Sequence, residues 1–242
     1  MAVRRMGRRA AVIAAAAVVL ASCGSDSSTE PVVSEPADAD SGAPAQAADT
    51  AAEPVDPAAC PPIDGTDEVV QEFSGAPPMC LDPAVDYSAL VTTTAGDITI
   101  DLDADAAPVT VNSFVFLARN NYFDDTVCHR VIQDFVAQCG DPTATGRGGP
   151  GYQFEDELPQ AGAYEVGSIA MANSGPNTNG SQFFIISGPN GAALPPLYSL
   201  FGEVSGEGDL DVVAEMNARG SLDSSGIASD EVRILDVEII QS

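Results

Sequence analysis

The chain is poor in basic side chains. It has 9 arginines and lysines together, none of them lysine, against 36 aspartates and glutamates, and its formal net charge is −27 at pH 7. A surface with this charge repels a phosphate backbone, which excludes nucleic acid as a partner. The charge does not indicate a basic substrate, because compositional drift and solubility explain it more simply.

Histidine is almost absent, and the single residue is His129. A zinc site needs close ligand pairs such as Cys-x-x-Cys, whereas Cys128, His129 and Cys139 give at most three ligands with poor spacing. Cys128 and His129 are neighbours on a predicted strand, so their side chains point to opposite faces and cannot act as nucleophile and base. We expect no metal and no cofactor, and His129 as a hydrogen-bonded core residue.

No apolar run reaches the ~20 residues that a membrane span needs. Residues 11–21 form a shorter apolar run after a start with four arginines, and Leu20-Ala21-Ser22-Cys23 resembles the bacterial lipobox. These features predict a lipoprotein signal peptide over residues 1–22 and a lipid anchor on Cys23. The protein is then expected at the cell membrane, on the extracytoplasmic side. The alternative is an ordinary secretory signal with an incidental cysteine.

The next segment has a disordered composition. Residues 24–59 contain no aromatic and no basic residue. Such a segment buries too little apolar surface to offset its ordering entropy, so residues 23–59 are predicted to be a disordered acidic tether rich in alanine and proline.

Four cysteines remain after Cys23, an even number that suits an oxidising compartment. Cys60 and Cys80 bracket a proline-rich stretch, which predicts a disulfide-clasped extension over residues 60–84. Cys128 with Cys139 would be the second bridge, in one of the three connectivities that four cysteines permit. Strict alternation puts Cys128 and Cys139 on different faces, so this bridge requires a bulge near Gly140.

Residues 85–242 are predicted to form one compact, β-rich domain. Residues 88–94 and 98–102 predict a hairpin, and residues 128–132 and 135–139 predict another through Gln133-Asp134. The second hairpin could align Arg130 with Val136 and Gln138 on one face. Helices are predicted from Pro108 and over residues 209–218. Closing the sheet into a barrel would remove its edges.

A glycine-rich stretch, GRGGPG over residues 146–151, matches the phosphate-binding pattern G-x-G-x-x-G. That pattern binds phosphate only between a strand and a helix. The strand-like sequence Tyr152-Gln153-Phe154 follows it here, so we interpret the stretch as a flexible turn.

The most specific motif is MANSGPNTNGSQFFI over residues 171–185. Together with His129-Arg130-Val131-Ile132 and Gly140-Asp141, it closely resembles the cyclophilin family of peptidyl-prolyl cis-trans isomerases, and the likeness runs from about residue 89 to residue 240. The resemblance implies a mainly β fold: an eight-stranded antiparallel closed β-barrel capped by two α-helices, with the active-site groove on its outside.

The resemblance also implies the site, with Arg130 as the catalytic residue beside the X-Pro bond. The implied catalytic residues are Arg130, Phe135, Gln138 and Phe184, and the implied substrate-binding residues are Val136, Ala172, Asn173, Gln182, Leu194 and Tyr198. Val136 stands where the family commonly has methionine, Ala193 where larger members place tryptophan, and Tyr198 where a histidine often sits.

The resemblance implies a peptidyl-prolyl cis-trans isomerase. With the signal peptide, it predicts action on X-Pro bonds of exported proteins, and we expect the protein to be monomeric. Its partners would be proline-containing unfolded or flexible polypeptides, and its lipid anchor would hold it at the outer face of the cytoplasmic membrane. One alternative is a membrane-tethered module that holds proline-containing segments with little turnover. Another is a structural envelope protein with an idle barrel, which the intact Arg130 disfavours.

Lipidation of Cys23 can be tested on the native protein. Mass spectrometry of the amino terminus should find cleavage before Cys23 and the added mass of acyl chains. An unmodified Cys23, or cleavage elsewhere, would contradict the prediction.

Overall fold

The computed structural model describes residue 56 and residues 59–242. The predicted signal peptide, Cys23 and nearly all of the predicted tether lie outside these residues. One eight-stranded antiparallel sheet has the order β3-β4-β6-β5-β7-β2-β1-β8. The strands are β1 Tyr87–Thr93, β2 Gly96–Leu102, β3 Arg130–Ile132, β4 Val136–Cys139, β5 Ser168–Met171, β6 Phe183–Ile186, β7 Leu200–Val204 and β8 Ile234–Gln241. The helices are α1 Pro108–Arg119, α2 Pro189–Ala192 and α3 Asp209–Arg219.

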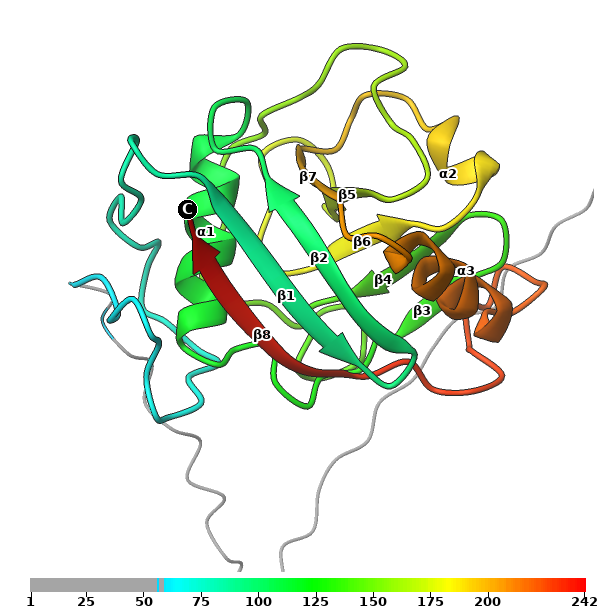
Figure 1. Cartoon of the computed structure of the whole chain (residues 1–242), viewed down its shortest axis with the longest axis horizontal. Coiled ribbons are helices and arrows are strands. Elements are labelled where there is room, and N and C mark those ends of the chain that lie inside the picture. Colours follow the sequence, from blue (N-terminus) through cyan, green and yellow to red (C-terminus); the bar gives the residue numbers. More distant parts are fainter. Residues whose placement is uncertain (1–55, 57–58) are drawn as a thin grey trace, which may run out of the picture. The chain divides into compact units, whose positions relative to one another are not determined.

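The expected closed barrel is wrong, because the sheet forms a half-barrel with β3 and β8 as its edges (Figure 1). At the seam, which is the gap between the edge strands β3 and β8, Val127 pairs with Arg233 in one isolated bridge. β3 begins only at Arg130, beyond this bridge, and its Val131 N–H donates to the carbonyl of Gly226 in a loop. Loop residues therefore fill the seam, and the strand ladder does not continue from β3 to β8.

The expected number of helices is also wrong, since residues 59–242 contain three. The two predicted helices are present: α1 begins at Pro108, and α3 ends at Arg219, one residue beyond its predicted end. α1 packs against β8, and α3 packs against β2 and β3 (Figure 1). The unpredicted α2 is a single four-residue turn that starts at Pro189, where a missing N–H removes no hydrogen bond. No helix within residues 59–242 is long and apolar enough to span a bilayer.

Both predicted hairpins are present. In the second, Arg130 lies opposite Gln138 and Ile132 lies opposite Val136, which places these side chains on one face as predicted. The connecting Asp134 has φ 58°, in the left-handed region that aspartate tolerates better than most residues. The hairpin therefore presents Arg130 and Gln138 together.

The structure pairs Cys60 with Cys80 and Cys128 with Cys139, the connectivity that the sequence analysis expected. The β3–β4 ladder has no register shift, and neither does the β4–β6 ladder, which runs through Cys139, so the bulge expected near Gly140 is wrong. Cys128 lies before the first residue of β3, where the alternation of strand side chains no longer applies. The chain can therefore turn the Cys128 side chain toward Cys139 without a bulge.

An aromatic cluster forms the centre of the core. The ring of Phe114 on α1 lies 5.1 Å from Phe123, 5.6 Å from Phe183 and 5.3 Å from Phe201, centroid to centroid, and all four are buried. Complete burial of each such side chain contributes about 1.5–3 kcal/mol. The cluster holds β6 with Phe183 inward, which turns its neighbour Phe184 to the other side of the sheet.

The extension over residues 60–84 contributes to this core. Phe73 is 2% exposed, and its ring lies 5.0 Å from Phe116 and 6.5 Å from Tyr152. Its backbone N–H donates to the Pro150 carbonyl at 2.8 Å. Cys80 N–H donates to the Asn112 side chain at 2.7 Å, which ties the disulfide to α1. The extension therefore stabilises the domain rather than hanging from it.

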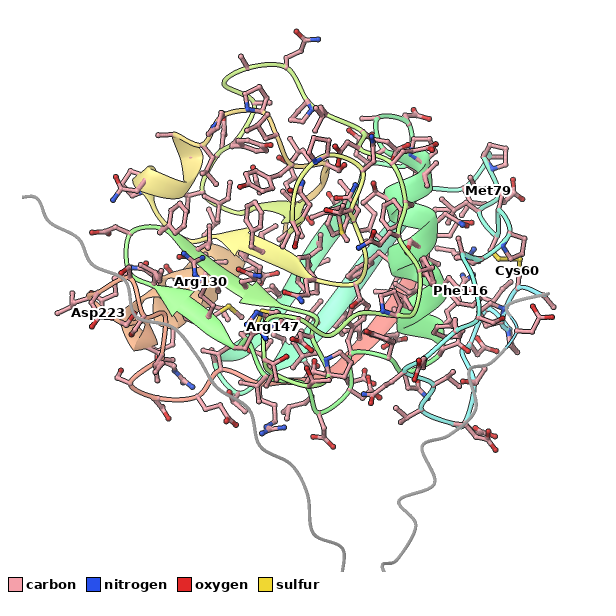
Figure 2. All side chains as sticks on the ribbon, turned by 180° about the vertical axis from the view of Figure 1, so that it is seen from behind. Cys60, Met79, Phe116, Arg130, Arg147 and Asp223 are labelled. Atoms are coloured by element: carbon pink, nitrogen blue, oxygen red, sulfur yellow. A yellow bond between two sulfur atoms is a disulfide. The ribbon has the colours of Figure 1, made fainter. Side chains whose placement is uncertain are left out.

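Phe73→Ala should lower the free energy of unfolding by about 3–5 kcal/mol, because it leaves a cavity beside Phe116. Met79→Ala is a matched control in the same extension, since Met79 is 57% exposed (Figure 2). Urea unfolding of both variants tests this prediction. Equal unfolding midpoints for Phe73→Ala and Met79→Ala would show that the extension contributes nothing to the core.

Candidate functional site

A shallow hollow of about 120 Å³ lies on the outer side of the sheet, over β4 and β6. Nine of the ten site residues implied by the resemblance line it, and Gln182, the tenth, is bonded to one of them. The nine are Arg130, Phe135, Val136, Gln138, Ala172, Asn173, Phe184, Leu194 and Tyr198. The tertiary structure thus gathers residues from four separated segments into one place.

The floor of the hollow is apolar. Val136 and Phe184 are buried and belong to a second apolar cluster with Ala170 and Ile186, separate from the main core. The Phe184 and Tyr198 rings meet edge to face at a centroid distance of 5.3 Å. A small apolar ring can be buried on this floor and leave little room for water.

Arg130, at the start of β3, lines the same hollow as this floor. Its guanidinium carbon lies 5.4 Å from the centroid of the Phe135 ring, within the range of a cation–π interaction. Within residues 59–242, the guanidinium forms no ion pair. Its N–H groups can therefore donate to a bound peptide.

Two glutamines continue the site away from Arg130. Gln138 Nε2 donates to Gln182 Oε1 at 3.0 Å, and Gln182 Nε2 donates to the Gly148 carbonyl at 2.9 Å. These bonds fix both side-chain amides. A second hollow of about 190 Å³ begins here and shares Gln138, Ala172 and Asn173 with the first.

The glycine-rich stretch that forms one wall of the second hollow is held by Asp141, a residue to which the sequence analysis gave no role. The buried carboxylate accepts bonds from Thr143 N at 2.8 Å, Thr143 Oγ1 at 2.7 Å, Thr145 N at 3.1 Å and Gly148 N at 3.1 Å. Burial alone would raise the pKa of Asp141, but these hydrogen bonds outweigh it and hold the pKa below its ordinary value. Asp141 thus holds the stretch directly at Gly148 and holds Thr143 and Thr145 just before it.

Tyr164 is a second residue that the sequence analysis missed. Its buried hydroxyl donates to the Tyr198 carbonyl at 2.6 Å and accepts from the Tyr198 N–H at 3.1 Å. Burial raises the pKa of Tyr164. A lone tyrosine in a loop carries no local signal of this role, which is to hold Tyr198 against Phe184.

The expected hydrogen bonding of His129 is wrong. Both of its ring nitrogens are buried, and neither has a partner among the described residues. Burial lowers the pKa of His129, so the ring stays neutral at pH 7, and the nearby Asp141 is already occupied by the loop. His129 packs beside Gly146 and takes no part in the hollow that Arg130 lines.

The structure is thus an antiparallel half-barrel that carries an arginine beside an apolar hollow on its outer face. The family model for cyclophilin type peptidyl-prolyl cis-trans isomerase/CLD matches residues 88–239. The chain belongs to this family.

Its relatives include a probable peptidyl-prolyl cis-trans isomerase B of Mycobacterium leprae, 41% identical over 60% of this chain and 52% of the relative. The chain thus spans about half the length of this relative. Peptidyl-prolyl cis-trans isomerase cypE of Dictyostelium discoideum is 40% identical over 62% of this chain and 96% of its own length. A Cryptosporidium parvum cyclophilin crystallised in the presence of the dipeptide Ala-Pro matches with a TM-score of 0.57 and 32% identity, over 64% of this chain and 99% of that one.

Asp141→Asn should lower the free energy of unfolding by about 1–3 kcal/mol at pH 7, because an amide cannot accept all the bonds that the carboxylate accepts. The folded-state pKa is depressed, so this contribution is complete above the unfolded-state pKa and is lost as the pH falls through the folded pKa. The difference between wild type and variant should therefore be constant from pH 8 to 5 and shrink below about pH 4.

Urea unfolding at several pH values measures this difference. Asp67→Asn is the control, since Asp67 is exposed on the extension and should leave stability unchanged. A difference that grew on acidification would mean that Asp141 is protonated in the folded protein.

Proposed function

We propose that the protein is a peptidyl-prolyl cis-trans isomerase. The observation that supports this most directly is the position of Arg130, an arginine without an ion pair in residues 59–242, at the edge of an apolar hollow. The hollow, about 120 Å³, suits a single small ring such as that of proline.

The chemistry needs no covalent step. Rotation about the amide must overcome ~18–20 kcal/mol, because resonance is lost in the twisted state. The prolyl nitrogen then regains its lone pair, and an N–H of Arg130 can donate to it. This bond exists only in the twisted state, so it lowers the barrier instead of merely tightening binding.

The apolar floor supports this step in two ways. Val136, Phe184 and Leu194 would bury the proline ring and hold the prolyl nitrogen in place. They would also exclude water, which strengthens the bond from Arg130. The relative crystallised with Ala-Pro supports a proline-containing ligand for this fold. Gln138 and Gln182, held by their mutual bond, would orient the peptide backbone.

An uncatalysed X-Pro bond isomerises in ~10–100 s at 25 °C. Removing about 7 kcal/mol from the barrier brings this to the millisecond range or faster. The substrates we propose are exported proteins at the outer face of the cytoplasmic membrane. The two disulfides support this location, since such bonds persist in oxidising compartments, and the lipobox-like sequence before Cys23 supports the membrane anchor.

Arg130→Ala should lower kcat/KM by roughly 10²–10³, the typical effect of losing one transition-state donor, while the protein stays folded. Arg130→Lys should restore only part of the activity, because an ammonium cannot reproduce the planar guanidinium. Catalysed cis-trans exchange of a proline peptide measures both variants, with circular dichroism to confirm folding.

Cys128→Ser with Cys139→Ser is the matched control beside Arg130. This double variant should lose stability but keep most of the activity, because neither sulfur lines the hollow. Full activity in folded Arg130→Ala would overturn the mechanism. Binding of proline peptides without catalysed exchange in the wild type would favour the tethered binding module.

A further inference from the structure

The loop over residues 221–229, between α3 and β8, carries the two most exposed large apolar side chains of the described chain. Leu222 is 90% exposed and Ile227 is 75% exposed. Single exposed apolar residues are common, but two in one short loop form a potential contact surface.

This loop lies directly against the arginine of the site. The Val131 N–H donates to the Gly226 carbonyl at 2.8 Å, and Ser221 N–H donates to the Val131 carbonyl at 3.0 Å. Gly226 has φ 70°, and a Cβ at this position would collide with Cγ of Arg130. The loop backbone therefore touches the stem of Arg130, a residue that lines the hollow.

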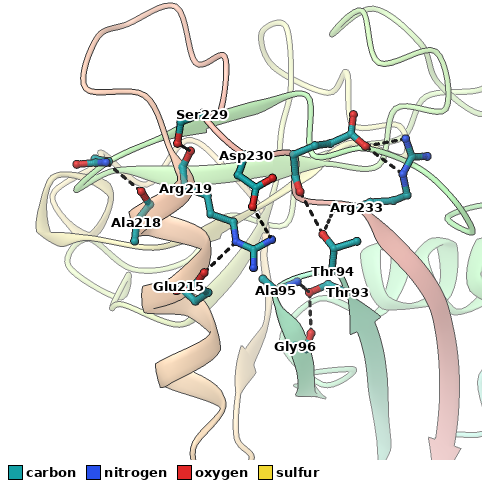
Figure 3. A network of polar contacts seen from close by, with 12 residues as sticks. Thr93, Thr94, Ala95, Gly96, Glu215, Ala218, Arg219, Ser229, Asp230 and Arg233 are labelled. Atoms are coloured by element: carbon teal, nitrogen blue, oxygen red, sulfur yellow. Dashed lines mark hydrogen bonds and ion pairs between the residues drawn. The ribbon is translucent and has the colours of Figure 1, made fainter.

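The loop is also held at both ends. Ser229 N and Oγ donate to the Arg219 carbonyl at 2.7 and 2.9 Å, and the Arg219 guanidinium pairs with Asp230 at 3.6 Å (Figure 3). Arg233 pairs with Glu231 at 2.8 Å (Figure 3).

The tip of the loop has internal bonds of its own. Ser221 Oγ donates to the Asp223 carbonyl at 2.8 Å, and Asp223 Oδ1 accepts from Ser225 N at 2.9 Å. The exposure of Leu222 and Ile227 is thus built into an ordered loop. Figure 2 shows Asp223, at the tip, on the side of Arg130 away from Arg147.

We propose that Leu222 and Ile227 form a specificity site that binds an apolar side chain on one flank of the substrate proline. The occupant we propose is the substrate polypeptide itself, because the loop contacts Arg130, which lines the hollow, and a chain that extends beyond the hollow on this side would meet the loop. Burying apolar surface favours binding in proportion to its area, so apolar flanking residues raise kcat/KM. This inference rests on the proposed isomerase function.

The test compares a short peptide, Ala-Ala-Pro-Ala, with longer peptides that carry Leu or Ser at the second to fourth positions on either side of proline. In the wild type, Leu should raise kcat/KM about 3- to 10-fold over Ser on one flank only. Leu222→Ser with Ile227→Ser should remove this preference and leave activity on the short peptide within about twofold. Cis-trans exchange at equilibrium gives each value.

Met79→Ser is the control for loss of an exposed apolar side chain. Met79 lies at the far end of the molecule from Asp223 (Figure 2), so this variant should keep the preference for leucine. A leucine preference that is absent in the wild type, or unchanged in the double variant, would overturn the specificity site while the short peptide still turns over. No exchange on any peptide would instead overturn the isomerase function. A dimer seen in sedimentation that the double variant abolishes would assign the surface to a second copy of the chain, and would also refute the proposal.

Discussion

The alternation of side chains across β4 and β6 is the constraint on which the site depends. Phe183 points into the aromatic core, so its neighbour Phe184 must face the groove. On β4, Ala137 faces the core while Val136 and Gln138 face the groove, and Gln138 lies opposite Phe184. A slip of one residue would exchange the two sets. Core packing therefore fixes the floor of the site at the same time as it stabilises the sheet.

Buried polar groups then hold the parts of the groove that the sheet does not reach. Asp141 fixes the glycine-rich loop, whose Gly148 carbonyl accepts from Gln182, so a buried carboxylate determines the position of a groove side chain. The Tyr164 hydroxyl likewise determines the position of Tyr198, because it bonds to the Tyr198 backbone. Side chains fixed before a ligand arrives lose little freedom on binding, which favours both affinity and catalysis.

Charge also distinguishes the groove from the rest of the molecule. In a chain of net charge −27, Arg130 lines the first hollow and Arg147 lines the second. The open seam of the half-barrel contributes to the same region, because β3 pairs with β4 on one side and, within the described residues, has no strand on its other side. The loop over residues 221–229 can therefore bond to β3 and lie against Arg130.

The sequence by itself determined the features that depend on neighbouring residues: the hairpin that aligns Arg130 with Gln138, the start of α1, the bounds of α3 to within one residue, and the motif from which the groove residues were predicted. The tertiary structure alone decided the open seam and the roles of Phe73, Asp141 and Tyr164. Each of these depends on partners that are distant along the chain or in segments without periodicity, as Phe73 depends on Phe116. A local pattern records which face a side chain takes, but not which remote atoms meet it there.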